Sequence, residues 1–378
     1  MGDSSQYSIK VMSSVQSIDA DAWDLLTDGT PLLNHAFLSA LENSKSVGQN
    51  TGWIPYPIAV YNQEDILIGA MPLYLKNHSY GEYVFDWAWA DAYEKNGIAY
   101  YPKLVSAIPF SPITSKRLLS EHREVSELII TTLSQLLEKH QLSSAHVLFP
   151  SEACSQLLAS AGWLKRHGVQ FRWHNDKYTH FDEFLSTLNH HKRKKIKQER
   201  KKVAEANIDC HWLKGEEIQE QDWDFFYQCY CQTYFEHHSS PYLTRAFFSE
   251  IGQTMPENIL LIIAEENGQR VAATLNLYNQ HTLYGRYWGA VKYVPNLHFE
   301  LCYYQAQMFC IENKIEYFEG GAQGEHKLAR GFEPRPTCSY HKITHPDFEL
   351  AIREFVNQES DRIAEYTSEL EERAPFKK

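Results

Sequence analysis

Side chains suited to acid, base and charge-stabilising chemistry are concentrated in one short segment near the end of the chain. Residues 319–330 read EGGAQGEHKLAR and directly follow an apolar run that predicts a buried strand. Open α/β sheets place their sites at the carboxyl ends of such strands. The glycines let the backbone approach a ligand closely. The segment therefore predicts a reaction site, although a flexible loop followed by a capped short helix would contain the same residues.

The chemistry that these residues fit is acyl transfer to an amine. That reaction needs a base for the amine proton, a stabilised oxyanion and a proton for the leaving group. His326 or Glu325 would take the proton, and one cation at the oxyanion is worth about 3 kcal/mol. Lys327 or Arg330 would supply that cation. The expected catalytic residues are Lys327, His326, Glu325 and Glu319, and Gln323 and Arg330 are expected to bind substrate.

Two Tyr-Gly-x-Tyr turns supply further candidates. The first, at 80–83, is followed by a segment rich in Trp and Asp, which we interpret as a strand walling a polar substrate groove. Edge aromatics of a core strand would give the same pattern. In the second turn Arg286 replaces a glutamate, and its planar guanidinium fits a carboxylate or phosphate. The substrate-binding candidates from the turns are Asp86, Trp87, Trp89, Arg286 and Tyr287.

The elements that must position these residues occur twice along the chain. Residues 66–83 and 269–287 each read as a hairpin, and we align His78-Ser79 with His281-Thr282. A helix and a buried strand follow in each half, then a short helix that ends at glycine and an aromatic residue, and then a last strand. These are two mixed α/β units, expected at 1–175 and 176–348. Residues 349–378 predict a terminal amphipathic helix.

A strongly basic segment opens the second half. Eight of the eleven residues at 192–202 are Lys or Arg, while Ile196 and Val203 predict one buried helical stripe. A solvated helix face is the simplest interpretation. The alternative is a phosphate-binding surface for tRNA or a nucleotide-linked precursor. The residues expected to bind the polyanion are Lys192, Arg193, Lys194 and Lys195.

Composition bounds the remaining possibilities. The chain has 378 residues, with 36 Lys and Arg against 48 Asp and Glu, so its net charge of −12 argues against a general DNA-binding protein. We expect no metal site, because no CxxC pair occurs, and no transmembrane span, because no apolar run reaches about 18 residues. The seven cysteines are odd in number and lie in apolar stretches. Together these features predict a reduced, cytoplasmic protein.

Short strings spread over most of the chain carry a resemblance. They are HAFL at 35–38, TGW at 51–53, PLYLK at 72–76, SYGEYVFDWAW at 79–89, YPK at 101–103, GRYWG at 285–289 and EGGAQGEHK at 319–327. With the repeated unit, they resemble the Fem-like (FemAB-like) family of peptidoglycan biosynthesis/recognition proteins. The resemblance implies a tandem GNAT-like fold, that of the acyl-CoA N-acyltransferases, in which each repeat has a mixed, mostly antiparallel sheet flanked by helices. It adds Lys76 and Trp288 to the expected substrate-binding residues.

The resemblance also implies a function. Fem enzymes join an aminoacyl group to an amine and carry a lysine in the region of Lys327. We therefore expect an acyl- or aminoacyltransferase acting on a small-molecule or peptidoglycan-precursor amine. A non-catalytic module that binds such a precursor is the alternative.

The sequence departs from GNAT acetyltransferases at the loop that holds the coenzyme A pyrophosphate. Residues 294–300 and 120–124, which precede the two central helices, contain no glycine. Backbone N–H groups at a glycine-rich helix start are what normally hold such phosphates. The donor therefore stays open between an acyl-CoA and an aminoacyl-tRNA, and a plain acetyl-CoA acetyltransferase is a third possibility.

Overall fold

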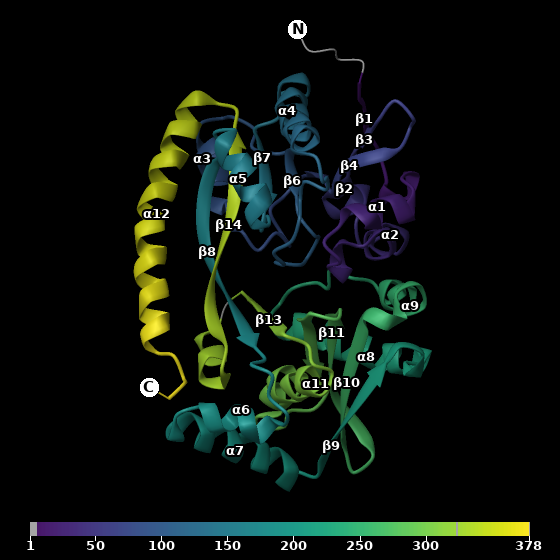
Figure 1. Ribbon diagram of the computed structural model, residues 1–378, viewed down its shortest axis with the longest axis vertical. Coiled ribbons are helices and arrows are strands. Elements are labelled where there is room, and N and C mark those ends of the chain that lie inside the picture. Colours follow the sequence, from purple (N-terminus) through teal and green to yellow (C-terminus); the bar gives the residue numbers. More distant parts are fainter. Residues whose placement is uncertain (1–5, 323, 378) are drawn as a thin grey trace. The chain divides into compact units, whose positions relative to one another are not determined.

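The computed structural model describes residues 6–322 and 324–377 (Figure 1). Its contacts divide the chain into two compact units, and each is described by itself. The first unit comprises 1–169 and 336–365, and the second comprises 170–335 and 366–378. The domain bounds expected from the sequence remain a prediction. Three elements contribute residues to both units: β8 (Leu164–His174), β14 (Glu333–Ile343) and α12 (Pro346–Glu372).

The first unit is built on a sheet of strand order β2-β5-β6-β7-β14, beside a small sheet of order β1-β3-β4. Strands β6 and β7 are parallel, and helix α4 connects them along the chain. Helix α4 is therefore the central helix of this unit. Ile129, Leu133 and Leu137 of α4 are buried in the core, which confirms the helical spacing predicted for this segment. The bounds are β1 Ser8–Val11, α1 Ala20–Leu26, α2 His35–Asn43, β2 Trp53–Pro55, β3 Ile58–Tyr61, β4 Leu67–Met71, β5 Tyr74–Lys76, α3 Trp87–Lys95, β6 Lys103–Ser106, α4 Arg123–Lys139, β7 Ser144–Leu148 and α5 Glu152–Ser160.

The second unit has the strand order β8-β13-β12-β11-β10-β9. Strands β12 and β13 are parallel, and the central helix lies between them in the chain. That helix is not uniform, because a π-helical turn at Glu300–Gln305 separates α10 from α11. The bounds are α6 Phe181–Thr187, α7 His190–Glu205, β9 Ile208–Lys214, α8 Glu220–Glu236, α9 Arg245–Thr254, β10 Ile259–Glu266, β11 Gln269–Tyr278, β12 Thr282–Ala290, α10 Leu297–Phe299, α11 Ala306–Glu312, β13 Tyr317–Ala322 and the 3-10 helix η7 Glu325–Arg330.

Each unit takes its last strand from the other half of the sequence. In the first unit, residues 339–343 of β14 pair antiparallel with β7. In the second unit, residues 170–174 of β8 pair antiparallel with β13. The short helices that precede these strands end as the sequence predicts. Gly162 and Gly331, at φ of 76° and 86°, adopt the left-handed conformation that follows a helix end.

The predicted alignment of the two Tyr-Gly-x-Tyr turns is wrong. In the second unit, Thr282 to Tyr284 lie within β12. In the first unit, the strand that pairs with β5 and lies parallel to β7 is β6, so residues 77–102 are inserted between the two hairpin strands. The hairpin expected at 66–83 also has no continuous first strand, because β4 ends at Met71 and β5 begins at Tyr74. The order of elements repeats, but the local motif does not.

The interpretation of the Trp- and Asp-rich segment after the first turn as a strand is also wrong, because this segment forms helix α3. Trp89 and Tyr93 are four residues apart and both are buried, which is the spacing of one helix face. Alanines between the aromatic residues favour a helix. Asp86 occupies the N-cap position but makes no capping hydrogen bond, because its carboxylate accepts hydrogen bonds from Lys103 and Tyr100.

Three further observations concern the residues that the structure describes. All seven cysteines are free thiols. Across 6–322 and 324–377, none of the helices combines the length with the apolar character that crossing a bilayer takes. Within the same ranges, three or more His, Cys, Asp or Glu side chains nowhere gather as metal ligands would.

Candidate active site in the second unit

A cavity of about 150 Å³ opens where β12 and β13 separate. The two strands pair only over Thr282–Tyr284 and Tyr317–Glu319. Beyond these residues their backbones no longer pair, and side chains from both strands, from β11 and from the central helix surround the gap. We call this the strand-gap cavity. Its lining residues are Thr274, Asn276, Gly285, Arg286, Tyr287, Trp288, His298, Cys302, Tyr303, Phe318, Gly320 and Lys327.

A β-bulge in β12 places Arg286 at the cavity. Leu275 pairs with Tyr287 and Asn276 pairs with Gly285, so Arg286 is the extra residue on its strand. Bulges re-aim side chains and are frequent beside active sites. The guanidinium lies over the ring of Tyr287, with its carbon 4.9 Å from the ring centroid. The structure thus brings the predicted residues Arg286, Tyr287 and Trp288 to one cavity.

Lys327 reaches the same cavity from η7. Its side chain is only 6% exposed. Burial lowers the pKa of Lys327 to about 8, since the charged ammonium loses water there. Its Nζ atom lies 5.6 Å from the centroid of the Phe171 ring. A lysine with this pKa is still mostly cationic at neutral pH and can stabilise a developing negative charge.

Asn276 is a cavity residue that the sequence reasoning missed. It is 1% exposed, and neither its amide nitrogen nor its amide oxygen has a hydrogen-bond partner among the described residues. Leaving a buried amide unpaired costs free energy, so such groups usually meet a ligand or water. An amide side chain in the mostly apolar run of β11, VAATLNLY, was the available signal.

His298 is the second residue that the sequence reasoning missed. It lies at the start of the central helix, with its ring 5.3 Å from that of Trp288. Burial, helped by the nearby His326, Arg330 and Lys327, lowers the pKa of His298 to about 4. The imidazole is therefore neutral at pH 7 and is a weak base, so its free ring nitrogen is suited to accept a hydrogen bond.

The predicted bases His326 and Glu325 are exposed and are not among the residues that line the cavity. The Tyr303 hydroxyl is 2.8 Å from Nε2 of His326, and Arg373 donates to Glu325 over 2.8 Å. Gln323, also predicted to bind substrate, lies outside the described residues. Their catalytic and binding roles remain predictions, whereas His298 is the imidazole that lines the cavity.

Arg330 is held by the protein itself. It is 1% exposed, and its Nη2 donates to both carboxylate oxygens of Glu199 over 2.9 Å. Tyr304 donates its hydroxyl hydrogen to the same carboxylate. Because α7 carries Glu199 and η7 carries Arg330, this ion pair fixes the segment on which Lys327 lies. The geometry gives Arg330 a positioning role.

Glu319 is paired as well. Its carboxylate accepts from Nε of Arg172 over 2.6 Å, and the side chain is largely buried beside the cavity residue Gly320. Cys302 also lines the cavity. Burial raises the pKa of the Cys302 thiol to about 12, which makes it a poor nucleophile.

The model of one protein family, FemAB-like, described as peptidoglycan biosynthesis/recognition, matches residues 14–378. The chain belongs to the FemAB-like family. Among curated proteins no match was found. The expected family is therefore confirmed over nearly the whole chain.

Solved structures agree with the fold of this FemAB-like chain. FemX is 10% identical with a TM-score of 0.54, covering 92% of this chain and 100% of FemX. A conserved protein of unknown function from Bacteroides thetaiotaomicron VPI-5482 is 12% identical with a TM-score of 0.52, over 89% and 100%. L-PGS from Bacillus licheniformis is 8% identical with a TM-score of 0.50, over 84% and 95%. At such identities the likeness shows the fold alone, and the tandem GNAT-like α/β class is confirmed.

The candidates in the first unit of the FemAB-like chain are mostly buried. Lys76, Asp86 and Trp89 are each less than 5% exposed, whereas Trp87 is 41% exposed. Burial lowers the pKa of Lys76 to about 7. Burial alone would raise the pKa of Asp86, but the adjacent Lys103 ammonium holds it well below its usual range. The substrate-binding role of these residues stays a prediction, and the structure shows three of them packed against other protein groups.

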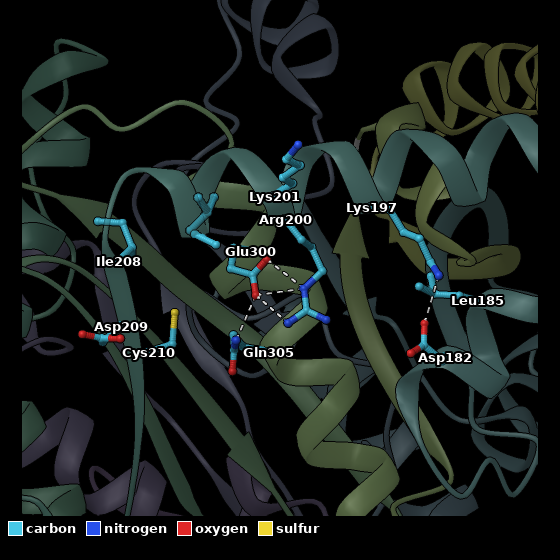
Figure 2. Close-up of a pocket in the computed structure, with 12 residues that line it drawn as sticks. Asp182, Leu185, Lys197, Arg200, Lys201, Ile208, Asp209, Cys210, Glu300 and Gln305 are labelled. Carbon is cyan, nitrogen blue, oxygen red and sulfur yellow. Dashed lines mark hydrogen bonds and ion pairs between the residues drawn. The ribbon is translucent and has the colours of Figure 1, made fainter.

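The basic segment forms helix α7, as predicted, with Ile196 and Val203 buried. Lys194 and Lys195 are exposed, and Lys192 and Arg193 are half-buried. Two other cations of α7, Lys197 and Arg200, are paired, and Figure 2 shows them at a hollow of about 470 Å³. There Lys197 points toward Asp182 and Arg200 toward Glu300, over 3.3 Å and 3.2 Å.

Proposed function

We propose that this FemAB-like protein transfers an acyl or aminoacyl group to an amine and forms an amide in the strand-gap cavity. One observation carries the proposal: the buried cation of Lys327 and the unpaired amide of Asn276 line the same small cavity. A cation can stabilise the negative charge that develops on the oxygen of a reacting carbonyl, and a free amide can form hydrogen bonds with the acyl group. The family's description supports a peptidoglycan-precursor amine as the acceptor.

The reaction follows from the positions of these groups. Lys327 stabilises the oxyanion that forms when the amine attacks the acyl carbonyl carbon. His298, neutral at pH 7, accepts a hydrogen bond from the attacking amine and orients it, and the proton that the amine loses passes to the leaving group as the tetrahedral intermediate collapses. Asn276 offers its amide donor and acceptor to the acyl group. Arg286, at the bulge, is placed to bind a carboxylate or phosphate of either substrate.

The start of the central helix bears on the donor. The N–H groups of Leu297 and Phe299 donate to Val294 and Asn296 over 3.2 Å and 3.0 Å, within the helix's own first turn. Residues 294–300 contain no glycine, so this turn differs from the glycine-rich loop whose backbone amides hold a pyrophosphate. Acyl-CoA and aminoacyl-tRNA both remain candidate donors. The absence of a glycine-rich loop at this helix favours the aminoacyl-tRNA.

The pH dependence of amide formation tests the proposal. Purified protein is incubated with an acyl-CoA or an aminoacyl-tRNA and a peptidoglycan-precursor amine, and the amide is measured by mass spectrometry. Lys327 is cationic below its pKa of about 8, so the rate per unprotonated acceptor amine should fall as the pH rises through 8. Lys327→Arg, whose guanidinium stays charged, should remove that fall. Binding of the precursor without product from either donor would instead favour the non-catalytic binding module.

We expect the exposed face of α7 to bind a phosphate polyanion. Lys194 and Lys195 repel their basic neighbours unless an anionic partner offsets the repulsion. Charge reversal at both positions should weaken binding of tRNA in a filter assay, and should lower the slope of log affinity against log salt by about one for each phosphate that the helix no longer neutralises. The melting temperature should stay unchanged. As a control, charge reversal at the exposed Lys45 and Lys139 changes the net charge by the same amount. If both double variants lose the same tRNA affinity, α7 is a solvated helix face and not a specific binding surface.

A further inference from the structure

A second hollow, of about 420 Å³, adjoins the strand-gap cavity. Trp288 and His298 line both, so a ligand in one space lies beside the reacting groups of the other. We call it the ring-lined hollow. It is lined by Gln232, Thr233, Glu236, Trp288, Ala290, Val291, Lys292, Tyr293, Val294, Asn296, Leu297, His298 and Phe299.

One wall of the ring-lined hollow is the carboxyl end of α8, and it is rigidly placed. A Cβ atom on Gly289 would lie 1.9 Å from the carbonyl oxygen of Cys229, so the absence of a side chain lets α8 pack directly on β12. Thr233 also donates its hydroxyl hydrogen to the carbonyl oxygen of Trp288 over 2.8 Å. The last turn of α8 is therefore fixed against the strand that carries the cavity residues.

The electrostatic character of this wall is negative. Glu236 is the last residue of α8, a helix of 17 residues, so its carboxylate coincides with the negative end of the helix dipole. It accepts a hydrogen bond from the Gln232 amide over 3.1 Å, and among the described residues it forms no ion pair. Lys292, the cation in the same lining, is paired with Glu266.

Aromatic rings complete the ring-lined hollow. Trp288, Phe299 and Tyr293 all line it, and Tyr293 is 87% exposed. The face of an aromatic ring attracts a cation, most strongly for tryptophan. A carboxylate, a helix carboxyl end and several aromatic rings around one space all favour a positively charged ligand.

We propose that the ring-lined hollow binds a primary ammonium group of a substrate. Its place in the reaction rests on the proposed function, because it lies beside the cavity to which we assign acyl transfer. The ammonium group belongs either to an aminoacyl donor or to the amine acceptor, and the chemistry that recognises it is the same. Glu236 supplies the counter-charge, and Trp288, which also lines the strand-gap cavity, supplies an aromatic ring.

The test is a binding measurement that involves no turnover. L-Alanine methyl ester represents the donor, and Nα-acetyl-L-lysine methylamide represents the acceptor. Each is titrated by NMR against the full-length protein, beside its counterpart with an acetylated amine. We expect at least one free amine to bind about fivefold or more tightly than its blocked counterpart. Glu236→Gln should abolish that preference, and Glu257→Gln, which neutralises an exposed carboxylate elsewhere in the second unit, should not.

The probe that binds preferentially shows whether the ammonium group belongs to the donor or to the acceptor. A preference confined to the alanine ester places the ammonium on the donor, and one confined to the lysine derivative places it on the acceptor. Equal binding of free and blocked amines by the wild type, or a preference that survives Glu236→Gln, would overturn the proposal. Lys327→Ala should retain the preference, so a failure of the acyl-transfer assignment would leave this result intact.

Discussion

Replacing Lys327 with alanine should lower the rate of amide formation by about 10²- to 10³-fold, because one preorganised donor at an oxyanion is worth that much. The fold should survive the change. Burial depresses the pKa of Lys327 to about 8, so below that pH the buried ammonium costs stability relative to the unfolded chain. Removing it relieves this cost. The measurements are single-turnover amide formation by mass spectrometry and thermal unfolding by circular dichroism.

Two further variants show whether the cation itself matters. Lys327→Arg keeps a positive charge and should retain more activity than Lys327→Ala. Lys314→Ala removes an exposed lysine in the same unit and should leave the rate unchanged. If Lys327→Ala retains more than a third of the activity, the oxyanion role assigned to Lys327 is wrong.

Breaking the ion pair between Arg330 and Glu199 should lower the free energy of unfolding by about 3–5 kcal/mol, because removing one partner leaves the other charge buried and unpaired. Arg330 is 1% exposed and Glu199 is 7% exposed, so water cannot replace the lost partner. Arg330→Met and Glu199→Gln are the single changes. Urea unfolding, followed by tryptophan fluorescence, measures the loss of stability.

The double variant separates a buried pair from simple packing. Arg330→Met combined with Glu199→Gln should be more stable than the sum of the single losses predicts, since no charge is then left without a partner. The exposed pair of Lys201 and Glu205 provides the control, and Lys201→Ala should cost less than about 1 kcal/mol. A loss of that small size for Arg330→Met would show that the pair does not hold η7 in place.

The sequence predicted the order of elements because that order leaves local signals. Ile129, Leu133 and Leu137 repeat at helical spacing, and glycines mark the ends of the short helices. It also identified Arg286 and Lys327 as candidate site residues, and both line the strand-gap cavity. Local spacing failed at Trp87 to Lys95, where closely spaced aromatic residues were interpreted as a strand.

Contacts between distant positions explain what sequence reasoning missed. Glu199 and Arg330 are 131 residues apart, and no periodicity marks a charge on a basic helix as the partner of a later arginine. The sequence therefore predicted that Arg330 binds substrate. His298 drew no attention because its value comes from burial beside Trp288, and burial of a polar side chain depends on packing. Asn276 was different, since an amide inside an apolar strand is visible in the sequence.

The exchange of last strands has a consequence for how the protein is made. Strand β7 is complete at residue 148, but its antiparallel partner is formed by residues 339–343. At about 5–20 residues per second, a ribosome needs on the order of 10–40 s to supply that partner. During this interval one edge of a fully buried strand is open to other chains. The nascent protein is thus most exposed to aggregation in its first half, and a chaperone that covers this edge would act before synthesis ends.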